Sequence, residues 1–256
     1  MSRKFDRYIA LGDSLSIDLY PGLDVVERGD PSYTGPPPGG LGAASLLFRN
    51  DDARWPEFAG RDLSSIAPGI AFRNEHYQTG PRTVDGDHFA TDAATSTGVL
   101  AYQLARVPPS DERTLFTVTS GFFDVVQMMG APNPPPTLVE GMLSRTERLL
   151  RTIAETRPDS LVLFGTVVDP SDGTGDLETL EPFARERNWI ESYNLALREV
   201  IRPFSTARLV DLHGRLLGHG ASADDEERWY WRGSLLKPGA RGASEVRRLW
   251  LEALDG

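Results

Sequence analysis

The sequence predicts an α/β fold in which a parallel sheet carries helices on both faces. Two observations predict it. Short apolar runs recur along the chain with helical patterns between them, and the run "LVLFGTVV" at Leu161–Val168 is apolar throughout, as expected of a central parallel strand. At 256 residues the chain is long enough for one full core, so we expect a single domain spanning residues 1–256.

Five segments are predicted as strands, which makes the expected sheet five-stranded. They are Arg7–Leu11, Ile70–Phe72 (with or without His88–Ala90), Thr114–Thr119, Ser160–Val168 and Ala207–Leu212. Ligands of such folds gather beyond the carboxyl ends of the strands. Ser14 follows the first strand at such an end and is the first candidate for a functional residue.

Three segments are predicted as long helices from the spacing of their apolar residues. They are Thr137–Glu155, Leu177–Val200 (bent or restarted near Pro182) and Ala243–Leu254. In the last of these, Val246, Leu249, Trp250 and Leu254 share one face. We interpret these apolar stripes as core-packing surfaces.

Two segments do not fit the alternation of strands and helices. Tyr20–Arg54 contains "DPSYTGPPPGGLGAAS", whose proline and glycine content disfavours helix and strand alike. It is long for an idle connection, so it is expected to form a lid or wall over the strand ends, or else a surface loop. Met129–Pro136, "MGAPNPPP", is predicted to be a rigid connector.

Composition excludes several classes of partner. Acidic residues exceed basic ones by 37 to 27 without a basic stripe, so binding to nucleic acid or an anionic membrane is not expected. There is no cysteine, which excludes thiolate chemistry, and no histidine spacing typical of zinc; no metal or cofactor is predicted.

The N-terminus lacks the pattern of a signal peptide and no run is long enough to span a bilayer, so a cytoplasmic location is expected.

The block "ALGDSLS" at Ala10–Ser16 resembles the opening block of the GDSL, or SGNH, hydrolase family, in which the serine follows the first strand. Three further segments resemble later blocks in the family's order. "HFATDAATSTGVLAYQL" matches the second block with Ala93 at its glycine, "TLFTVTSGFFDVV" matches the third block from Gly121, and "SLLKPGARGASEVRRLW" matches the last block with Lys237-Pro238 at His-Pro.

The resemblance implies a flavodoxin-like three-layer α/β/α sandwich and hydrolysis of a small-molecule ester. In the family the serine attacks the carbonyl carbon, a histidine takes its proton, and an aspartate orients that histidine. The oxyanion is held by the N–H of the serine, the N–H of the second-block glycine and the side-chain amide of the third-block asparagine. Carried onto this chain, the first two positions are Ser14 and Ala93.

The departures from the family pattern concern the base and the oxyanion site. Ser234 and Lys237 stand where the last block has aspartate and histidine, and Phe123 stands where the third block has asparagine. A serine hydroxyl needs a base within hydrogen-bond reach to act as a nucleophile. Ala93 keeps the backbone donor, so it matters only if its position requires a positive φ.

Three substitutes for the missing base are considered. Lys237 could act in a serine–lysine pair if burial favoured its neutral form, although a solvated surface charge is the simpler interpretation. His213 or His219, in the loop after the fifth strand, could reach Ser14, although ordinary loop histidines are the simpler interpretation. Asp13 is interpreted as a turn or cap acceptor.

Asp124, beside the third-block position, is expected to support its loop. Two functions remain open from the sequence. The first is hydrolysis of small acyl esters through Ser14 with an altered base. The second is a catalytically degenerate protein that uses the same cleft to bind a ligand.

Overall fold

The computed structural model describes residues 5–18, 41–72, 87–129, 131, 135–172, 184–231 and 234–255. Its centre is a parallel sheet with the strand order β1-β2-β3-β4. The strands are β1 (Arg7–Leu11), β2 (Thr114–Val118), β3 (Leu161–Gly165) and β4 (Ala207–Val210). Every residue of β2 and β3 is buried, which explains why β3 is apolar without alternation. The two buried threonines of β2 are hydrogen-bonded, Thr114 to Arg157 and Thr117 to Tyr8.

The predicted α/β fold is confirmed, and the strand predicted at Ile70–Phe72, with or without His88–Ala90, is present only as two short bridges beside β1. Ala71 bridges Arg7 and His88 bridges Ala10, both in parallel orientation. The amide of Tyr8 donates to Ala71 at 2.8 Å and that of Ala10 donates to Asp87 at 2.9 Å. The predicted segments at 70–72 and 88–90 thus lie beside β1 at the edge of the sheet, although neither is long enough to form a regular strand.

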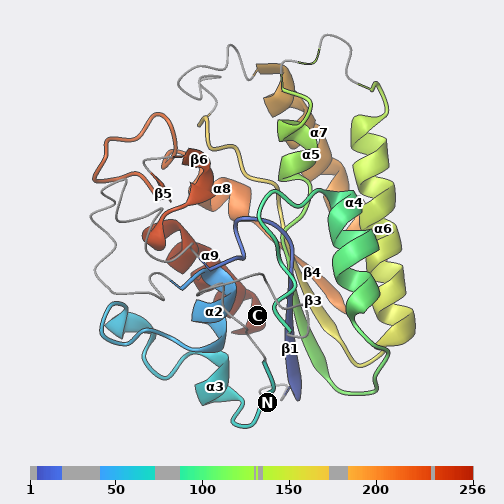
Figure 1. Ribbon diagram of the computed structural model, residues 1–256, viewed down its shortest axis with the longest axis vertical. Helices are drawn as coiled ribbons and strands as arrows, with labels where there is room; N and C mark the ends of the chain where they lie inside the picture. Colours follow the sequence, from blue (N-terminus) through green and yellow to red (C-terminus); the bar gives the residue numbers. More distant parts are fainter. Residues whose placement is uncertain are drawn as a thin grey trace.

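Helices cover both faces of the sheet (Figure 1). On one side lie α4 (Ser96–Gly98), α5 (Phe122–Val126), α6 (Leu138–Thr156) and α7 (Ala184–Ile201); on the other lie α2 (Ala43–Phe48), α3 (Leu63–Ile66) and α9 (Ala240–Asp255). The short η1 (Pro56–Phe58) and α8 (Leu212–Leu216) complete the layers, and η2 (Val99–Gln103) and η3 (Leu104–Arg106) continue α4.

The three predicted long helices form. The beginning of the one predicted from Leu177, with its bend at Pro182, lies outside the described residues. The expectation that the Pro/Gly-rich segment contains no helix is wrong for its last part. "AASLLF" at Ala43–Phe48 has neither proline nor glycine, and it forms α2 with five of its six residues buried. Residues 19–40 lie outside the described residues, so the lid or wall expected there remains a prediction.

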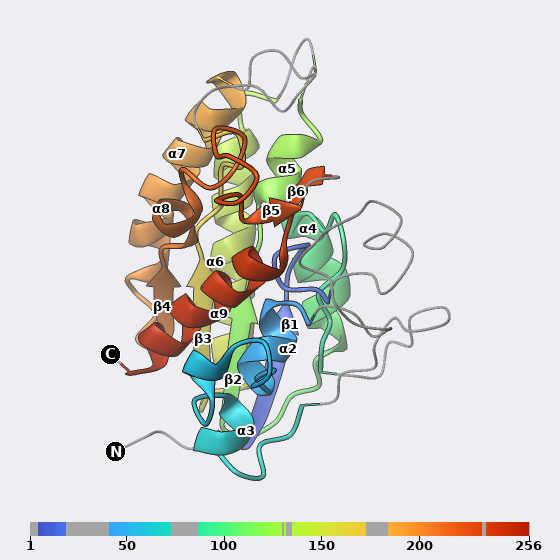
Figure 2. The same ribbon diagram turned by 90° about the vertical axis from the view of Figure 1, so that its left-hand side faces the viewer.

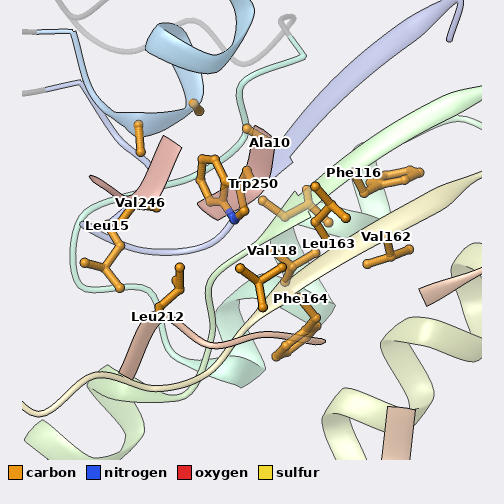
Figure 3. Packing of buried hydrophobic residues seen from close by; sticks show 14 of the residues in the cluster. Ala10, Leu15, Phe116, Val118, Val162, Leu163, Phe164, Leu212, Val246 and Trp250 are labelled. Carbon is orange, nitrogen blue, oxygen red and sulfur yellow. The ribbon is translucent and has the colours of Figure 1, made fainter. Parts of the chain in front are cut away.

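Buried side chains of the strands and helices form one contiguous cluster. Figure 3 shows Trp250 of α9 among core side chains that include Ala10 of β1 and Val118 of β2. Trp250 and Val246 are fully buried, which confirms the apolar stripe predicted for the last helix. Within the described residues, no helix has the length and apolar character needed to cross a bilayer.

A two-stranded antiparallel hairpin precedes α9. It consists of β5 (Tyr230–Trp231) and β6 (Ser234–Pro238), with Tyr230 opposite Pro238. The amide of Gly239 donates to the carbonyl of Trp229 at 2.7 Å and closes the hairpin onto the start of α9. The views in Figures 1 and 2 place the hairpin near the end of the sheet where the parallel strands finish.

Candidate functional site

The turn after β1 fixes the position of Ser14. The chain leaves the strand at Gly12 with a φ of +133°, and a Cβ there would collide with the backbone and side chain of Thr119, which follows β2. The Thr119 hydroxyl accepts the amide of Asp13 at 3.2 Å and is hydrogen-bonded to the Ser16 hydroxyl at 3.0 Å. Ser14 is therefore held at the carboxyl end of β1, and it is buried, with 2% of its surface exposed.

The Ser14 hydroxyl donates a hydrogen bond to Asp92 Oδ1 at 2.7 Å. The other carboxylate oxygen, Asp92 Oδ2, is paired with Lys237 Nζ at 2.8 Å. The side chains of Asp92 and Lys237 are 28% and 20% exposed, so solvent reaches this ion pair. Ser14, Asp92 and Lys237 thus form an array of a hydroxyl, a carboxylate and an ammonium group, each in contact with the next.

Asp92 was not among the site residues predicted from the sequence. It directly precedes Ala93, the residue aligned with the second-block glycine, and a carboxylate beside that position is the signal that could have identified it. Lys237 was predicted to lie near Ser14 as a base; in the structure it reaches Ser14 through Asp92. Lys237 is brought there by β6, whose partner strand β5 anchors it to the core.

Ala93 has a φ of +56°, a left-handed conformation that glycine adopts freely and alanine rarely does. The sequence left open whether this position requires a positive φ, and the structure shows that it has one. Within the described part of the chain, the amides of Ser14 and Ala93 donate no hydrogen bond to another residue. Both keep an N–H that can serve a bound carbonyl oxygen.

The third block is apolar where the family has an amide. Gly121 has a φ of +113° and begins α5, and a Cβ on it would press against Met142 and Val167. Phe123 is buried and meets the ring of Phe122 edge-on, with centroids 5.2 Å apart. Its phenyl ring offers no donor to an oxyanion, so the family's third donor is lost here.

Asp124 has the supporting role that the sequence predicts. Its carboxylate accepts the amide of Ser96 at 2.6 Å and the Ser96 hydroxyl at 2.7 Å. Arg145 of α6 donates to it at 3.1 Å. These contacts tie α4, α5 and α6 together and place no atom of Asp124 in contact with Ser14.

Neither candidate histidine contacts the array. His213 Nδ1 lies 3.1 Å from the Val167 carbonyl, and its amide donates to Thr166 at 2.8 Å. The His219 ring stacks on Trp229 with centroids 3.4 Å apart. Across the described ranges, no hydrogen bond joins either imidazole to the three residues of the array.

Asp13 is 1% exposed, and one of its carboxylate oxygens accepts the amide of Leu15 at 3.1 Å, as the turn interpretation predicts. The other oxygen, Oδ2, is buried and makes no hydrogen bond with any described residue. Burial raises the pKa of Asp13 to about 6, and the nearby charge of Asp92 acts in the same direction. A second, protonatable carboxyl group therefore adjoins the array.

Comparison with known proteins relates the chain to esterases and lipases through its fold. No protein-family model and no curated sequence matches it. Among solved structures, LAE5, an α/β hydrolase from the metagenome of Lake Arreo, has a TM-score of 0.59 at 18% identity over 98% of this chain and 96% of that one.

Two further solved structures have the same fold. The acetylxylan esterase Axe2 of Geobacillus stearothermophilus has a TM-score of 0.57 at 13% identity, over 100% of this chain and 97% of its own. An extracellular lipase of Streptomyces rimosus has a TM-score of 0.54 at 16% identity, over 96% and 99%. The SGNH-type fold implied by the opening block is thereby confirmed.

Proposed function

We propose that this chain, which has the fold of SGNH-type esterases and lipases, hydrolyses small acyl esters with Ser14 as nucleophile and Asp92 as its proton acceptor. The observation that carries the proposal is the 2.7 Å hydrogen bond from the Ser14 hydroxyl to Asp92. A nucleophilic serine requires an acceptor within this distance, and a carboxylate fills that position here.

The proposed reaction uses Asp92 as both base and acid. Ser14 Oγ forms a bond to the acyl carbon while its proton passes to Asp92 Oδ1. The tetrahedral intermediate breaks its bond to the alcohol oxygen, which takes that proton and leaves. Water then attacks the acyl-serine and gives its proton to Asp92; Ser14 Oγ leaves with that proton, and the carboxylic acid is released.

Lys237 has an electrostatic role in this proposal. Its ammonium group has three donors and no acceptor, so in the ion pair it has no lone pair for the serine proton. Paired with Oδ2 at 2.8 Å, it keeps Oδ1 turned towards Ser14 and offsets the charge of the carboxylate.

The oxyanion of the intermediate would be held by the free amides of Ser14 and Ala93. Phe123 supplies no third donor, and the loss of one such donor costs about 2.7–4 kcal/mol of transition-state stabilisation. We therefore expect hydrolysis to be slower by about 10²–10³-fold than with a complete oxyanion site. The restriction to small acyl groups is supported by the acetyl esters named for Axe2.

Two observations favour a second function, binding without turnover. Phe123 is buried at the oxyanion position, and no imidazole contacts Ser14 within the described residues. In that case the Ser14–Asp92–Lys237 array would bind the polar group of a ligand without attacking it. The same set of variants separates the two functions.

The experiment measures hydrolysis of p-nitrophenyl acetate, butyrate and octanoate by the wild type and by Ser14→Ala, with the exposed Ser205→Ala as control. We expect activity on acetate that is lost in Ser14→Ala and kept in Ser205→Ala. Asp92→Asn should lower kcat by about 10²–10⁴-fold, the usual contribution of a general base. Equal rates for wild type and Ser14→Ala would contradict the proposal and favour binding.

The base is identified by three further variants. If Asp92 accepts the proton, Lys237→Arg should retain most of the activity, because arginine keeps the positive charge, and Lys237→Met should lose more. Loss of activity in Lys237→Arg equal to that in Lys237→Met, with Asp92→Asn active, would assign the base to Lys237. Loss in His213→Ala alone would assign it to His213.

A further inference from the structure

Gln103 holds the turn that carries Ser14. Its side chain is buried, and its amide oxygen accepts the N–H of Gly12 at 2.7 Å. Its amide nitrogen donates to the carbonyl of Gly12 at 2.8 Å and to the hydroxyl of Thr91 at 3.1 Å. One side chain thus binds both backbone groups of Gly12 and reaches the neighbouring loop.

The two loops that Gln103 joins carry the reacting pair. Gly12 is two residues before Ser14, and Thr91 is one residue before Asp92. The amide of Thr91 also donates to the Gly12 carbonyl at 2.9 Å, so the loops meet at this point. Thr119 holds the Ser14 turn from the side of β2. Gln103 adds a second side-chain link between the two loops to the one that Ser14 makes with Asp92.

The local structure around Gln103 is itself unusual. Gln103 ends η2, a π-helical segment, and π-helical turns are rare and frequent at functional sites. The preceding α4 is fixed by Asp124, whose carboxylate binds the amide and hydroxyl of Ser96. The Gln103 side chain therefore extends from a fixed helix rather than from a loop.

We propose that Gln103 is the positioning residue that sets the distance between the Ser14 hydroxyl and Asp92. The inference rests on the proposed function, in which this hydrogen bond carries the proton. The turn beside Asp92 holds a non-glycine residue, Ala93, at a positive φ of +56°, so that turn depends on contacts from outside for its conformation. A displacement of about 1 Å between reacting groups can lower a rate by about 100-fold.

The test compares Gln103→Met and Gln103→Glu with Leu104→Met, a buried neighbour that is apolar. Methionine has the size of glutamine without its hydrogen bonds. We expect Gln103→Met to lower kcat on p-nitrophenyl acetate by about 10–100-fold with KM within twofold, and Leu104→Met to change neither. A loss of kcat in Gln103→Met no larger than in Leu104→Met would overturn the proposal.

The pH dependence of kcat in Gln103→Glu distinguishes a positioning role from a purely structural one. The protonated carboxyl can donate to the Gly12 carbonyl and accept its N–H, whereas the carboxylate can only accept. The ratio of kcat in Gln103→Glu to kcat in wild type should therefore rise as pH is lowered through the range in which the new carboxyl gains its proton. A ratio that does not change with pH would count against the positioning role.

Crystal structures of wild type and Gln103→Met separate this proposal from the proposed function. If the wild type hydrolyses no ester, the proposed function fails, and the positioning role is then judged by geometry alone. The proposal requires Ser14 Oγ and Asp92 Oδ1 to move beyond hydrogen-bond distance, about 3.5 Å, in an otherwise intact fold. A hydrogen bond that persists unchanged in Gln103→Met would refute it.

Discussion

The backbone at Ala93 has a φ of +56°, a conformation in which the alanine Cβ crowds the following carbonyl. Holding a non-glycine residue in this conformation costs about 1–2 kcal/mol, which a glycine would recover. Part of that stabilisation is offset because glycine increases the conformational entropy of the unfolded chain. We expect Ala93→Gly to raise the free energy of unfolding by about 0.5–1 kcal/mol, measured by urea denaturation.

Ala105→Gly is the matched control for Ala93→Gly. Ala105 is exposed in η3, where the helical backbone gives glycine no advantage, and the substitution should lower stability by about 0.5–1 kcal/mol. Opposite signs for the two substitutions would support the strain at Ala93. A loss of stability at both positions would show that Ala93 is unstrained in solution.

Asp13 predicts a pH dependence of stability. Its pKa of about 6 in the folded protein lies above the ordinary 3.8, so the folded state holds this proton more tightly than the unfolded state does. Its contribution is therefore fully present below about pH 4 and is lost as pH rises to about 6. A difference of about 2 in pKa corresponds to about 3 kcal/mol.

Asp13→Asn removes this titration. Between pH 4 and pH 7 the free energy of unfolding of the wild type should fall by about 3 kcal/mol relative to that of Asp13→Asn. The same substitution at the exposed Asp111 is the control for replacing an aspartate by asparagine. Parallel stability curves for wild type and Asp13→Asn would mean that Asp13 ionises normally in the folded protein.

At the scale of elements, the Asp124 carboxylate joins α4, α5 and α6. It accepts two hydrogen bonds from Ser96 and one from Arg145, and it is buried. Removing it leaves the Ser96 amide without its acceptor and the Arg145 guanidinium without its carboxylate. We expect Asp124→Ala to cost about 3–5 kcal/mol of stability by urea denaturation.

Glu140→Ala, an exposed carboxylate on α6, is the control for Asp124→Ala and should change stability by no more than about 0.5 kcal/mol. Asp124 also fixes α4, which leads into the helical segment that carries Gln103. In a stable Asp124→Asn variant, the hydrogen bond between Ser14 and Asp92 should therefore persist only if α4 keeps its position. A loss below about 1 kcal/mol in Asp124→Ala would show that the helices pack without this link.

At the scale of the whole molecule, Arg247 of α9 joins the C-terminal helix to the segment after α2. The side chain is fully buried and lies 3.5 Å above the ring of Phe58. It donates to Asn50 at 2.6 Å and to the Ser244 hydroxyl at 2.5 Å, and burial lowers its pKa to about 10. The buried guanidinium of Arg247 thus fixes α9, the helix that follows β6 and Lys237.

Arg247→Met should lower the free energy of unfolding by about 2–4 kcal/mol, because it leaves the Asn50 and Ser244 oxygens buried without a donor. Arg202 has an exposed side chain in the turn that follows α7. Arg202→Met should change the free energy of unfolding by no more than about 0.5 kcal/mol. Thermal and urea unfolding measure both variants. Equal stabilities would mean that a well-packed methionine replaces the cation without loss.

The sequence predicted the fold because the fold is determined by long apolar patterns. The first strand was placed at Arg7–Leu11, as found, and the last helix begins and ends within three residues of its prediction. The serine at a strand end was also predictable. These features depend on neighbours close in sequence, where periodicity carries information.

The array around Ser14 was predicted only in part because its contacts join distant residues. Asp92 and Lys237 are 145 residues apart in sequence, and a single aspartate in a turn has no periodic signal. Gln103 was missed because a buried glutamine in a helix resembles any other polar helix residue. Lysine usage was a clue, since Lys237 and Lys4 are the only lysines among 27 basic residues.

The order of the array along the chain has a consequence for its assembly during synthesis. β6, which carries Lys237, comes after all four strands of the parallel sheet. A growing chain therefore contains the Ser14 and Asp92 loops and all four strands of the sheet before Lys237 is added. Until the hairpin docks, the Asp92 carboxylate lacks the Lys237 ammonium group, so under the proposed mechanism Ser14 and its proton acceptor are made before the cation that orients that acceptor.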